Sequence, residues 1–139
     1  MPKFMVLVPG SAESEAGVMP PTELFEEMAA YNNQLAKAGV LLAAEGLKPT
    51  SAAAKVRFDD TERRTVIDGP FTEAKEIIAG YWLLQASSLE EALEWVKRAP
   101  FGGGVTLEVR PIGSMDELGL EFSPELREAQ QQLRQQLGQ

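Results

Sequence analysis

Two strand–helix–strand patterns lie in this chain, one on each side of a predicted hairpin, and their order constrains the fold more than any other feature. In the first, residues 4–8 form a short apolar run ended by a Pro-Gly pair, which is typical of a buried strand. A helix follows, beginning with a proline pair before Thr22 and ending at Gly39. Its apolar stripe consists of residues at helical spacing: Leu24, Met28, Tyr31 and Leu35. Residues 40–44 predict the next strand.

A loop inside the first pattern, a hairpin between the two patterns and the strand that opens the second pattern are also predicted. Residues 10–21 contain Ser, Gly, Glu and Pro and are expected to form a loop long enough to act as a flap. Residues 54–58 and 64–67 flank a polar turn and predict an antiparallel hairpin. The central strand is predicted over residues 77–84, where Gly80 leaves room for a close neighbour.

The second pattern continues with a helix and a last strand, and a further helix follows. Ser88 and Glu91 have the spacing of a capping box at the start of the second helix. Residues 105–110 alternate between apolar and polar side chains, which predicts a strand with one polar face. Ser123 is the predicted N-cap of a tail helix. The tail helix has a narrow apolar stripe: Leu126, Ala129, Leu133 and Leu137.

This order of elements predicts an α+β fold, a ferredoxin-like βαββαβ sandwich with an inserted hairpin and a C-terminal helix. Both crossover helices must lie on one face of the sheet, so the apolar side chains on the other face need a cover. A second copy related by a two-fold axis is the simplest cover. We expect one domain over residues 1–115 and a helical extension over 116–139, packed on the domain or on the partner subunit.

Composition excludes several classes of function. The net charge of −8 argues against a nucleic-acid binder, which needs clustered Lys and Arg for phosphates. With no Cys and no His, the chain has no thiolate site, no His-ligated metal and no His general base, so we predict no metal and no cofactor. No apolar stretch reaches about 18 residues. We therefore expect no membrane span, no signal peptide and a cytoplasmic location.

Four segments carry a resemblance to a known family. They are the Asp-Gly-Pro-Phe motif at residues 68–76 with the Gly-Tyr-Trp that follows at 80–82, and the segments 43–47, 88–92 and 109–112. Together they resemble the DGPF branch of the YCII-related family over roughly residues 3–112. The nine-residue motif with Gly-Tyr-Trp is specific, whereas a bare Asp-Gly-Pro-Phe would be weak.

The resemblance implies a dimeric α/β barrel, in which two ferredoxin-like sheets face each other around a cavity. Proteins of similar fold include small-molecule isomerases and cofactor-independent monooxygenases. Some YCII-type proteins have a His-Asp pair near the cleft, which cannot be carried over because this chain has no histidine. The resemblance also implies association with extracytoplasmic-function sigma factors.

Asp68 is the first candidate for a catalytic residue. A carboxylate beside a tight Gly-Pro turn could act as a general base if its surroundings raise its pKa. The alternative is an Asx turn, in which Asp68 accepts backbone N–H groups and only holds the loop. Phe71 and Lys75 are candidate ligand contacts, with a core role and a simple surface charge as their respective alternatives.

Four more candidates for ligand binding lie on the predicted strands. Glu108 and Arg110 share one strand face, where Arg110 would bind an anionic ligand or would instead pair with Glu108. Tyr81 and Trp82 are neighbours and must point to opposite faces, one into the core and one into the cavity. The sequence leaves open which of the two faces the cavity.

Two functions are compatible with these features. The first is a small-molecule-binding or regulatory dimeric module, with a small organic ligand and no catalysis. The alternative is a cofactor-independent enzyme, isomerase-like or monooxygenase-like, that uses Asp68 for acid–base chemistry.

Overall fold

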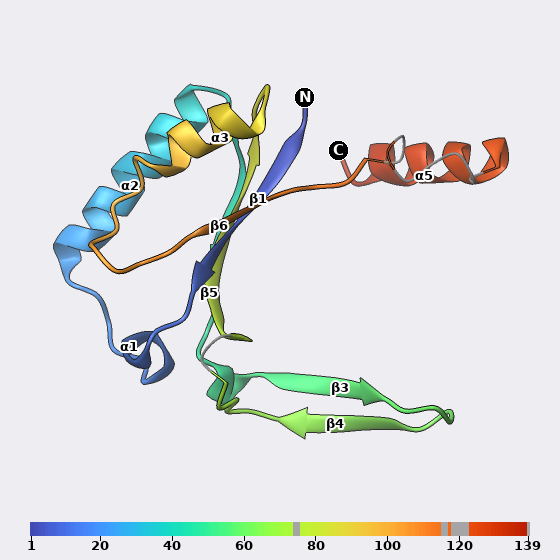
Figure 1. Cartoon of the computed structure of the whole chain (residues 1–139), viewed down its shortest axis with the longest axis horizontal. Helices are drawn as coiled ribbons and strands as arrows, with labels where there is room; N and C mark the ends of the chain where they lie inside the picture. Colours follow the sequence, from blue (N-terminus) through green and yellow to red (C-terminus); the bar gives the residue numbers. More distant parts are fainter. Residues whose placement is uncertain (74–75, 115–116, 118–122, 139) are drawn as a thin grey trace.

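The protein folds into a four-stranded antiparallel sheet with helices on one face (Figure 1). The computed structural model describes residues 1–73, 76–114, 117 and 123–138. The elements are β1 (Lys3–Pro9), α1 (Ala12–Glu15), α2 (Thr22–Lys37), β2 (Leu41–Gly46), η1 (Thr50–Ala52), β3 (Ala54–Phe58), β4 (Arg64–Asp68), β5 (Ile78–Gln85), α3 (Leu89–Val96), β6 (Glu108–Pro111) and α5 (Pro124–Gln136). The main sheet has the order β2-β5-β1-β6, and β3 pairs only with β4. This topology confirms the predicted ferredoxin-like α+β fold with an inserted hairpin.

The core lies between the sheet and the two helices α2 and α3. On β1 the buried residues are Phe4 and Val6, which stand opposite Leu84 and Trp82 of β5 in the ladder. Leu35 of α2 is fully buried against this cluster, as its position in the apolar stripe predicts. Since successive strand residues point to opposite faces, Trp82 belongs to the helix-covered face and Tyr81 to the other. Trp82 is thus the one of the two that enters the core.

The opposite face of the sheet carries no covering element among the described residues (Figure 1). Its side chains include Met5 and Leu7 of β1, which pair with Leu83 and Tyr81 of β5, and all four are only half-buried. This surface, defined by Met5, Leu7, Tyr81 and Leu83, is called the open face below. An apolar sheet face of this kind is typical of an interaction surface.

The ends of the helices follow local capping chemistry. Gly39 has a φ of 74°, the left-handed conformation predicted for the residue that terminates α2. The Ser88 hydroxyl accepts the Glu91 N–H at 3.1 Å, as predicted for the N-cap of α3. The Glu91 carboxylate, however, accepts hydrogen bonds from the backbone and hydroxyl of Ser87, so only half of the predicted capping box forms.

The segment predicted as a loop over residues 10–21 contains the short helix α1. Ser11 caps this helix, and Ser11 and Ser14 exchange backbone-to-hydroxyl hydrogen bonds of 2.8 and 3.1 Å. The apolar periodicity that signals longer helices cannot reveal a single turn, because its four residues are all at least partly exposed. α1 lies in the connection between β1 and α2, at one end of the sheet (Figure 1).

The last strand, β6, begins later than predicted. Residues 105–110 were expected to form it, whereas the observed strand starts at Glu108 and ends at Pro111. Its ladder with β1 runs from Phe4 opposite Pro111 to Leu7 opposite Glu108. Beyond that point β1 approaches a register shift and Pro9, which has no N–H to donate, so the alternating residues before Glu108 have no ladder partner.

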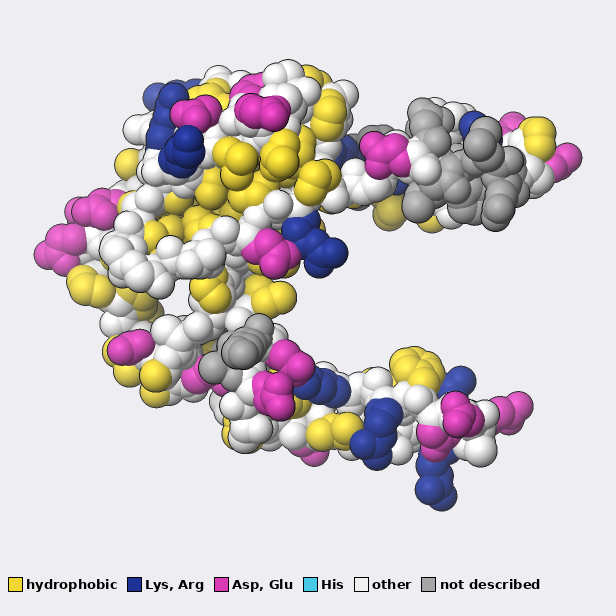
Figure 2. Space-filling view, in the orientation of Figure 1, with side chains coloured by type: hydrophobic (Ala, Val, Ile, Leu, Met, Phe, Trp, Pro, Cys, Tyr) yellow, Lys and Arg dark blue, Asp and Glu magenta, His cyan; other side chains and the backbone are white. Residues whose placement is uncertain are grey.

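Two elements project away from the sheet on the side of the open face. They are the β3–β4 hairpin and α5, which appear as separate arms in Figures 1 and 2. The leucines of the predicted tail stripe are exposed: Leu126, Leu133 and Leu137. Among the described residues, no helix is long and apolar enough to cross a membrane.

Candidate functional site

A cavity of about 430 Å³ lies between α2 and one end of the main sheet. Its floor includes Ala44 of β2 and Gly80 of β5, both on the helix-covered face. Because these residues have at most a methyl group, α2 does not close onto the sheet here, and the space persists. A Cβ on Gly80 would lie 2.9 Å from the Glu45 carbonyl oxygen, which confirms the close approach predicted for this glycine.

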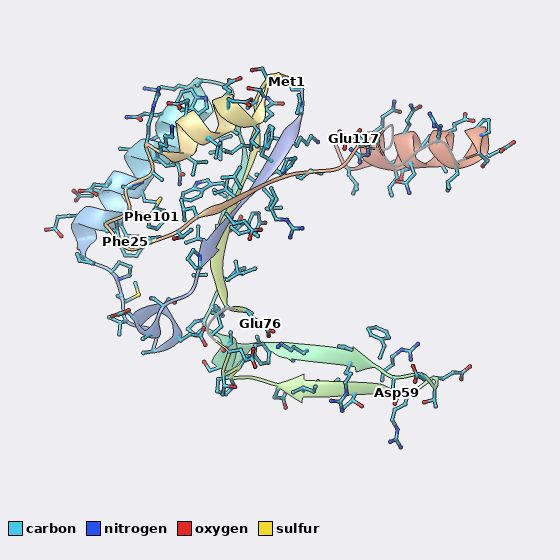
Figure 3. The ribbon with its side chains drawn as sticks, viewed as in Figure 1. Met1, Phe25, Asp59, Glu76, Phe101 and Glu117 are labelled. Atoms are coloured by element: carbon cyan, nitrogen blue, oxygen red, sulfur yellow. The ribbon has the colours of Figure 1, made fainter. Side chains whose placement is uncertain are left out.

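Aromatic rings form the inner wall of the cavity. The Trp82 ring meets Tyr31 edge to face, with 5.7 Å between ring centroids, and meets Phe101 at 6.1 Å. Phe101, labelled in Figure 3, comes from the loop after α3. Leu24 and Met28 of α2 add apolar side chains to the lining. The wall is therefore suited to the flat or aliphatic part of a small organic molecule.

One polar group is fixed inside this apolar surface. The Trp82 indole N–H donates to the Asn32 side-chain oxygen at 2.8 Å, and both residues line the cavity. With its oxygen occupied, Asn32 retains an amide NH₂ group that has no hydrogen-bond partner among the described residues. The site thus holds an oriented hydrogen-bond donor, which suits a ligand oxygen that accepts.

The electrostatics of the lining disfavour an anion, because no described residue of the lining is Lys or Arg. Glu45 also borders the cavity, but it stands opposite Tyr81 in the ladder, so its carboxylate belongs to the open face. Ser11 and Ser14 also reach the rim, where their hydroxyls are engaged in capping α1. The described residues contain no group of three or more carboxylates that could hold a metal ion. The arrangement therefore favours a neutral molecule with one accepting oxygen.

Tyr31 stands behind Trp82 and connects α2 to α3. Its hydroxyl donates to the Trp95 carbonyl oxygen at 2.7 Å. Burial raises the pKa of Tyr31 to about 12, and the nearby Arg98 opposes this only partly. The neutral phenol is therefore the form that the folded protein requires.

This requirement predicts a loss of stability at alkaline pH. In the folded protein the pKa of Tyr31 lies above the ordinary value of 10. The contribution of the neutral Tyr31 phenol to the free energy of unfolding is therefore complete below pH 10 and is lost as the pH rises towards about 12. Urea unfolding at pH 9 and pH 11.5 should show a larger fall for wild type than for Tyr31→Phe. At pH 9 the same variant should lose about 1 kcal/mol, because the hydrogen bond to Trp95 is gone.

Tyr81→Phe is the matched control for this prediction, because the chain has only two tyrosines and this variant leaves the Tyr31 hydrogen bond in place. Between pH 9 and pH 11.5, its free energy of unfolding should fall as much as that of wild type. Equal pH dependence in all three proteins would contradict the assignment to Tyr31.

A second cluster anchors the loop of the Asp-Gly-Pro-Phe motif beside α1. The Glu15 carboxylate accepts hydrogen bonds from the backbone N–H and the hydroxyl of Thr50, at 3.1 and 2.5 Å. The same hydroxyl oxygen accepts the Phe71 N–H at 3.0 Å. The Lys55 ammonium lies 4.2 Å from the centre of the Phe71 ring. These contacts tie the motif to α1, the helix that also contributes to the cavity rim.

The structure separates the residues of the motif from the cavity. Asp68 is exposed at the end of β4 and does not line the cavity. The hydrogen bonds that an Asx turn would require of its carboxylate are not found among the described residues, and Gly69 instead donates its N–H to Ala53 at 2.8 Å. Phe71 is half-buried under Lys55, and Lys75 lies outside the described residues. The catalytic hypothesis for Asp68 stays a prediction.

The strand candidates divide between the cavity and the far edge of the sheet. Trp82 lines the cavity with its side chain from within the core. Tyr81 also borders the cavity, but its side chain points to the open face. Glu108 and Arg110 lie on β6, are exposed, and form an ion pair with 3.4 Å between Arg110 Nε and the Glu108 carboxylate. This is the charge pair given above as the alternative to anion binding, and neither residue lines the cavity.

Sequence reasoning missed the polar residues that organise the site. Asn32 follows Leu24 and Met28 at spacings of four. A polar residue on an apolar helix stripe was therefore the sequence signal that could have identified Asn32 as a site residue. No such signal exists for the contact between Glu15 and Thr50, which are 35 residues apart.

Comparison with known proteins gives two findings. The sequence model of the family described as "YCII-related domain" matches residues 3–116. An uncharacterised protein of Rhizobium meliloti (strain 1021) is 35% identical over 91 residues, which cover 64% of this chain and 73% of the relative.

Proposed function

Since this chain belongs to the YCII-related domain family, we propose that it is a homodimeric module that binds a small organic molecule in the cavity beneath α2. The observation that carries the proposal is the NH₂ group of Asn32, which has no hydrogen-bond partner in the part of the chain that the structure describes and is held in place by Trp82 inside a mainly apolar cavity. A convergent polar group in an apolar pocket is the usual arrangement of a ligand site.

The ligand class follows from the lining. An aromatic or aliphatic body would pack between Trp82 and Phe101, and a carbonyl or hydroxyl oxygen would accept from Asn32. A carboxylate ligand would find no Lys or Arg side chain among the described residues of the lining. We therefore propose a neutral molecule, such as an aromatic ketone, a phenol or a lactone, rather than an organic acid.

The homodimer is the second part of the proposal. The apolar side chains of the open face lie on the side of the sheet opposite the cavity, so covering them would leave the floor of Ala44 and Gly80 accessible to a ligand. Dimerisation through that face would satisfy the need of Met5, Leu7 and Leu83 for an apolar partner.

Acetophenone and benzoate are suitable probes, because they have similar size and shape and differ in charge. Thermal-shift and calorimetric titrations should show acetophenone binding more tightly than benzoate by at least tenfold. In Asn32→Ala the affinity for acetophenone should fall about tenfold, since one hydrogen bond to the ligand is lost.

Asn33→Ala is the matched control, because Asn33 has the same side chain on the next residue of α2 but is exposed. It should bind acetophenone as wild type does. Preferred binding of benzoate, or an equal loss in both variants, would contradict the proposed site. The absence of any shift with acetophenone and with a panel of neutral lactones and phenols would contradict the proposed function.

A further inference from the structure

The β3–β4 hairpin has one largely apolar face on which no other helix or strand packs among the described residues, although the Arg64 guanidinium lies 4.5 Å from the centre of the Phe58 ring. Cross-strand pairing places Val56 opposite Val66, and Phe58 lies two residues from Val56 on the same face. These three side chains are 54%, 65% and 68% exposed in the order Val56, Val66 and Phe58. The other face carries mainly polar residues, including Lys55 and Arg57. The hairpin is therefore amphipathic, although it has no layer to pack on.

A hairpin of this kind is marginally stable by itself in water. The two strands form a separate two-stranded sheet, and Figure 1 shows them extending from the end of the main sheet. β-Branched and aromatic residues on one face of a strand pair normally pack on a third element. A surface outside the single chain can supply that element.

The surface area of the chain indicates how much cover is missing. The chain exposes 10332 Å². A compact monomer of this mass, 15.2 kDa, exposes about 7,100 Å². The excess is about 3,200 Å² per chain, or about 6,400 Å² for two chains. This is more than the surface that obligate homodimers bury, which is about 2,000–5,000 Å² for both partners together.

The position of the hairpin favours a second copy of the chain as its partner. The hairpin and α5 project on the same side of the sheet as the open face, with open space between them (Figure 2). A body that covers the open face must therefore lie beside the hairpin. In a two-fold dimer the same contact occurs twice, so each hairpin meets the other chain.

We propose that the β3–β4 hairpin is an exchanged arm, which packs the apolar face of Val56, Phe58 and Val66 onto a second copy of this chain. The inference rests on the homodimer of the proposed function and adds a contact outside the open face.

Sedimentation equilibrium of the full chain provides the test. Wild type should have twice the chain mass of 15.2 kDa at micromolar concentration. Val66→Lys should weaken the dimer at least tenfold, because it places a charge on the apolar face. Thr65→Lys adds the same charge to the neighbouring residue on the opposite face. The dimer dissociation constant of this variant should stay within threefold of the wild-type value. Far-UV circular dichroism and the fluorescence of the two tryptophans, Trp82 and Trp95, should match wild type in both variants, since the hairpin lies outside the core.

The outcomes separate the arm from the open-face dimer and from ligand binding. Leu83→Lys, on the open face, should dissociate the proposed dimer. If Leu83→Lys dissociates the dimer and Val66→Lys does not, the homodimer stands and the exchanged arm is overturned. A monomeric wild type overturns both. Neither result depends on the acetophenone titrations.

Cross-linking gives a second readout. The chain has no cysteine, so Phe58→Cys introduces a single thiol for a benzophenone maleimide. In a mixture of ¹⁴N and ¹⁵N chains, the photoproducts should join peptides of different isotopic mass. Photoproducts confined to one chain would overturn the proposal.

Discussion

Gly69→Ala is expected to destabilise the protein by about 3 kcal/mol, the upper end of the usual cost of overpacking. A Cβ on Gly69 would lie 1.8 Å from the Thr50 carbonyl oxygen and 3.2 Å from that of Ala53. Both are backbone atoms, so no side-chain rotation can relieve the clash. The Gly69 N–H also donates to Ala53 at 2.8 Å, which fixes the two segments against each other.

The clash should propagate to the anchor of the motif loop. Displacing Thr50 would break its hydrogen bonds to Glu15 and to the Phe71 N–H, and so would release the loop from α1. Close packing on Thr50 therefore requires a glycine at this position of the Asp-Gly-Pro-Phe motif, whatever the chemistry of Asp68.

Urea denaturation monitored by Trp fluorescence would measure this loss. Gly103→Ala is the control, because a Cβ at Gly103 meets no atom within 4 Å. It should change the free energy of unfolding by no more than about 0.5 kcal/mol. A Gly69→Ala protein as stable as the Gly103→Ala protein would contradict the close packing of Gly69 on Thr50.

Ala44→Phe is expected to abolish binding in the cavity beneath α2. Ala44 lines the cavity, stands opposite Trp82 in the ladder and faces α2, so a phenyl ring there would occupy the space proposed for the ligand. The dissociation constant for acetophenone should rise at least 100-fold, or about 2.8 kcal/mol. Isothermal titration calorimetry would measure the change.

Ala43→Phe provides a control for size and for strand propensity. Ala43 is the preceding residue of β2 and stands opposite Leu83, so its side chain points away from the cavity. This variant should bind acetophenone within about threefold of wild type. An equal loss of acetophenone affinity in the two variants would indicate a general effect of the substitutions on β2. Unchanged affinity in Ala44→Phe would place the ligand outside this cavity.

Together, these two predictions and the comparison of Asn32→Ala with Asn33→Ala test three separate properties of the chain. Gly69→Ala tests the support of the motif loop, Ala44→Phe tests the space in the cavity, and Asn32→Ala tests its polar contact. A protein that binds acetophenone only when Ala44 and Asn32 are intact would be a neutral-ligand binder with a defined site.

Local features of the sequence were sufficient for the elements and their order. The apolar stripe from Leu24 to Leu35 predicted α2, and Ser88 and Ser123 marked the starts of α3 and α5. Each of these signals involves residues three or four apart, and the backbone responds to them before any tertiary contact forms. α1 was missed because a single turn has no periodicity, and β6 began late because its partner strand ends.

The sequence by itself therefore determined the strands, the long helices, the α+β class and the family resemblance, since these depend on neighbours along the chain. Tertiary structure alone decided that Trp82 enters the core, that its indole N–H holds Asn32 fifty residues away, and that Ala44 and Gly80 leave a cavity. It also placed Asp68 away from that cavity and left one face of the hairpin exposed. A cavity is formed by side chains that do not reach one another, and only the packing of distant segments fixes where that happens.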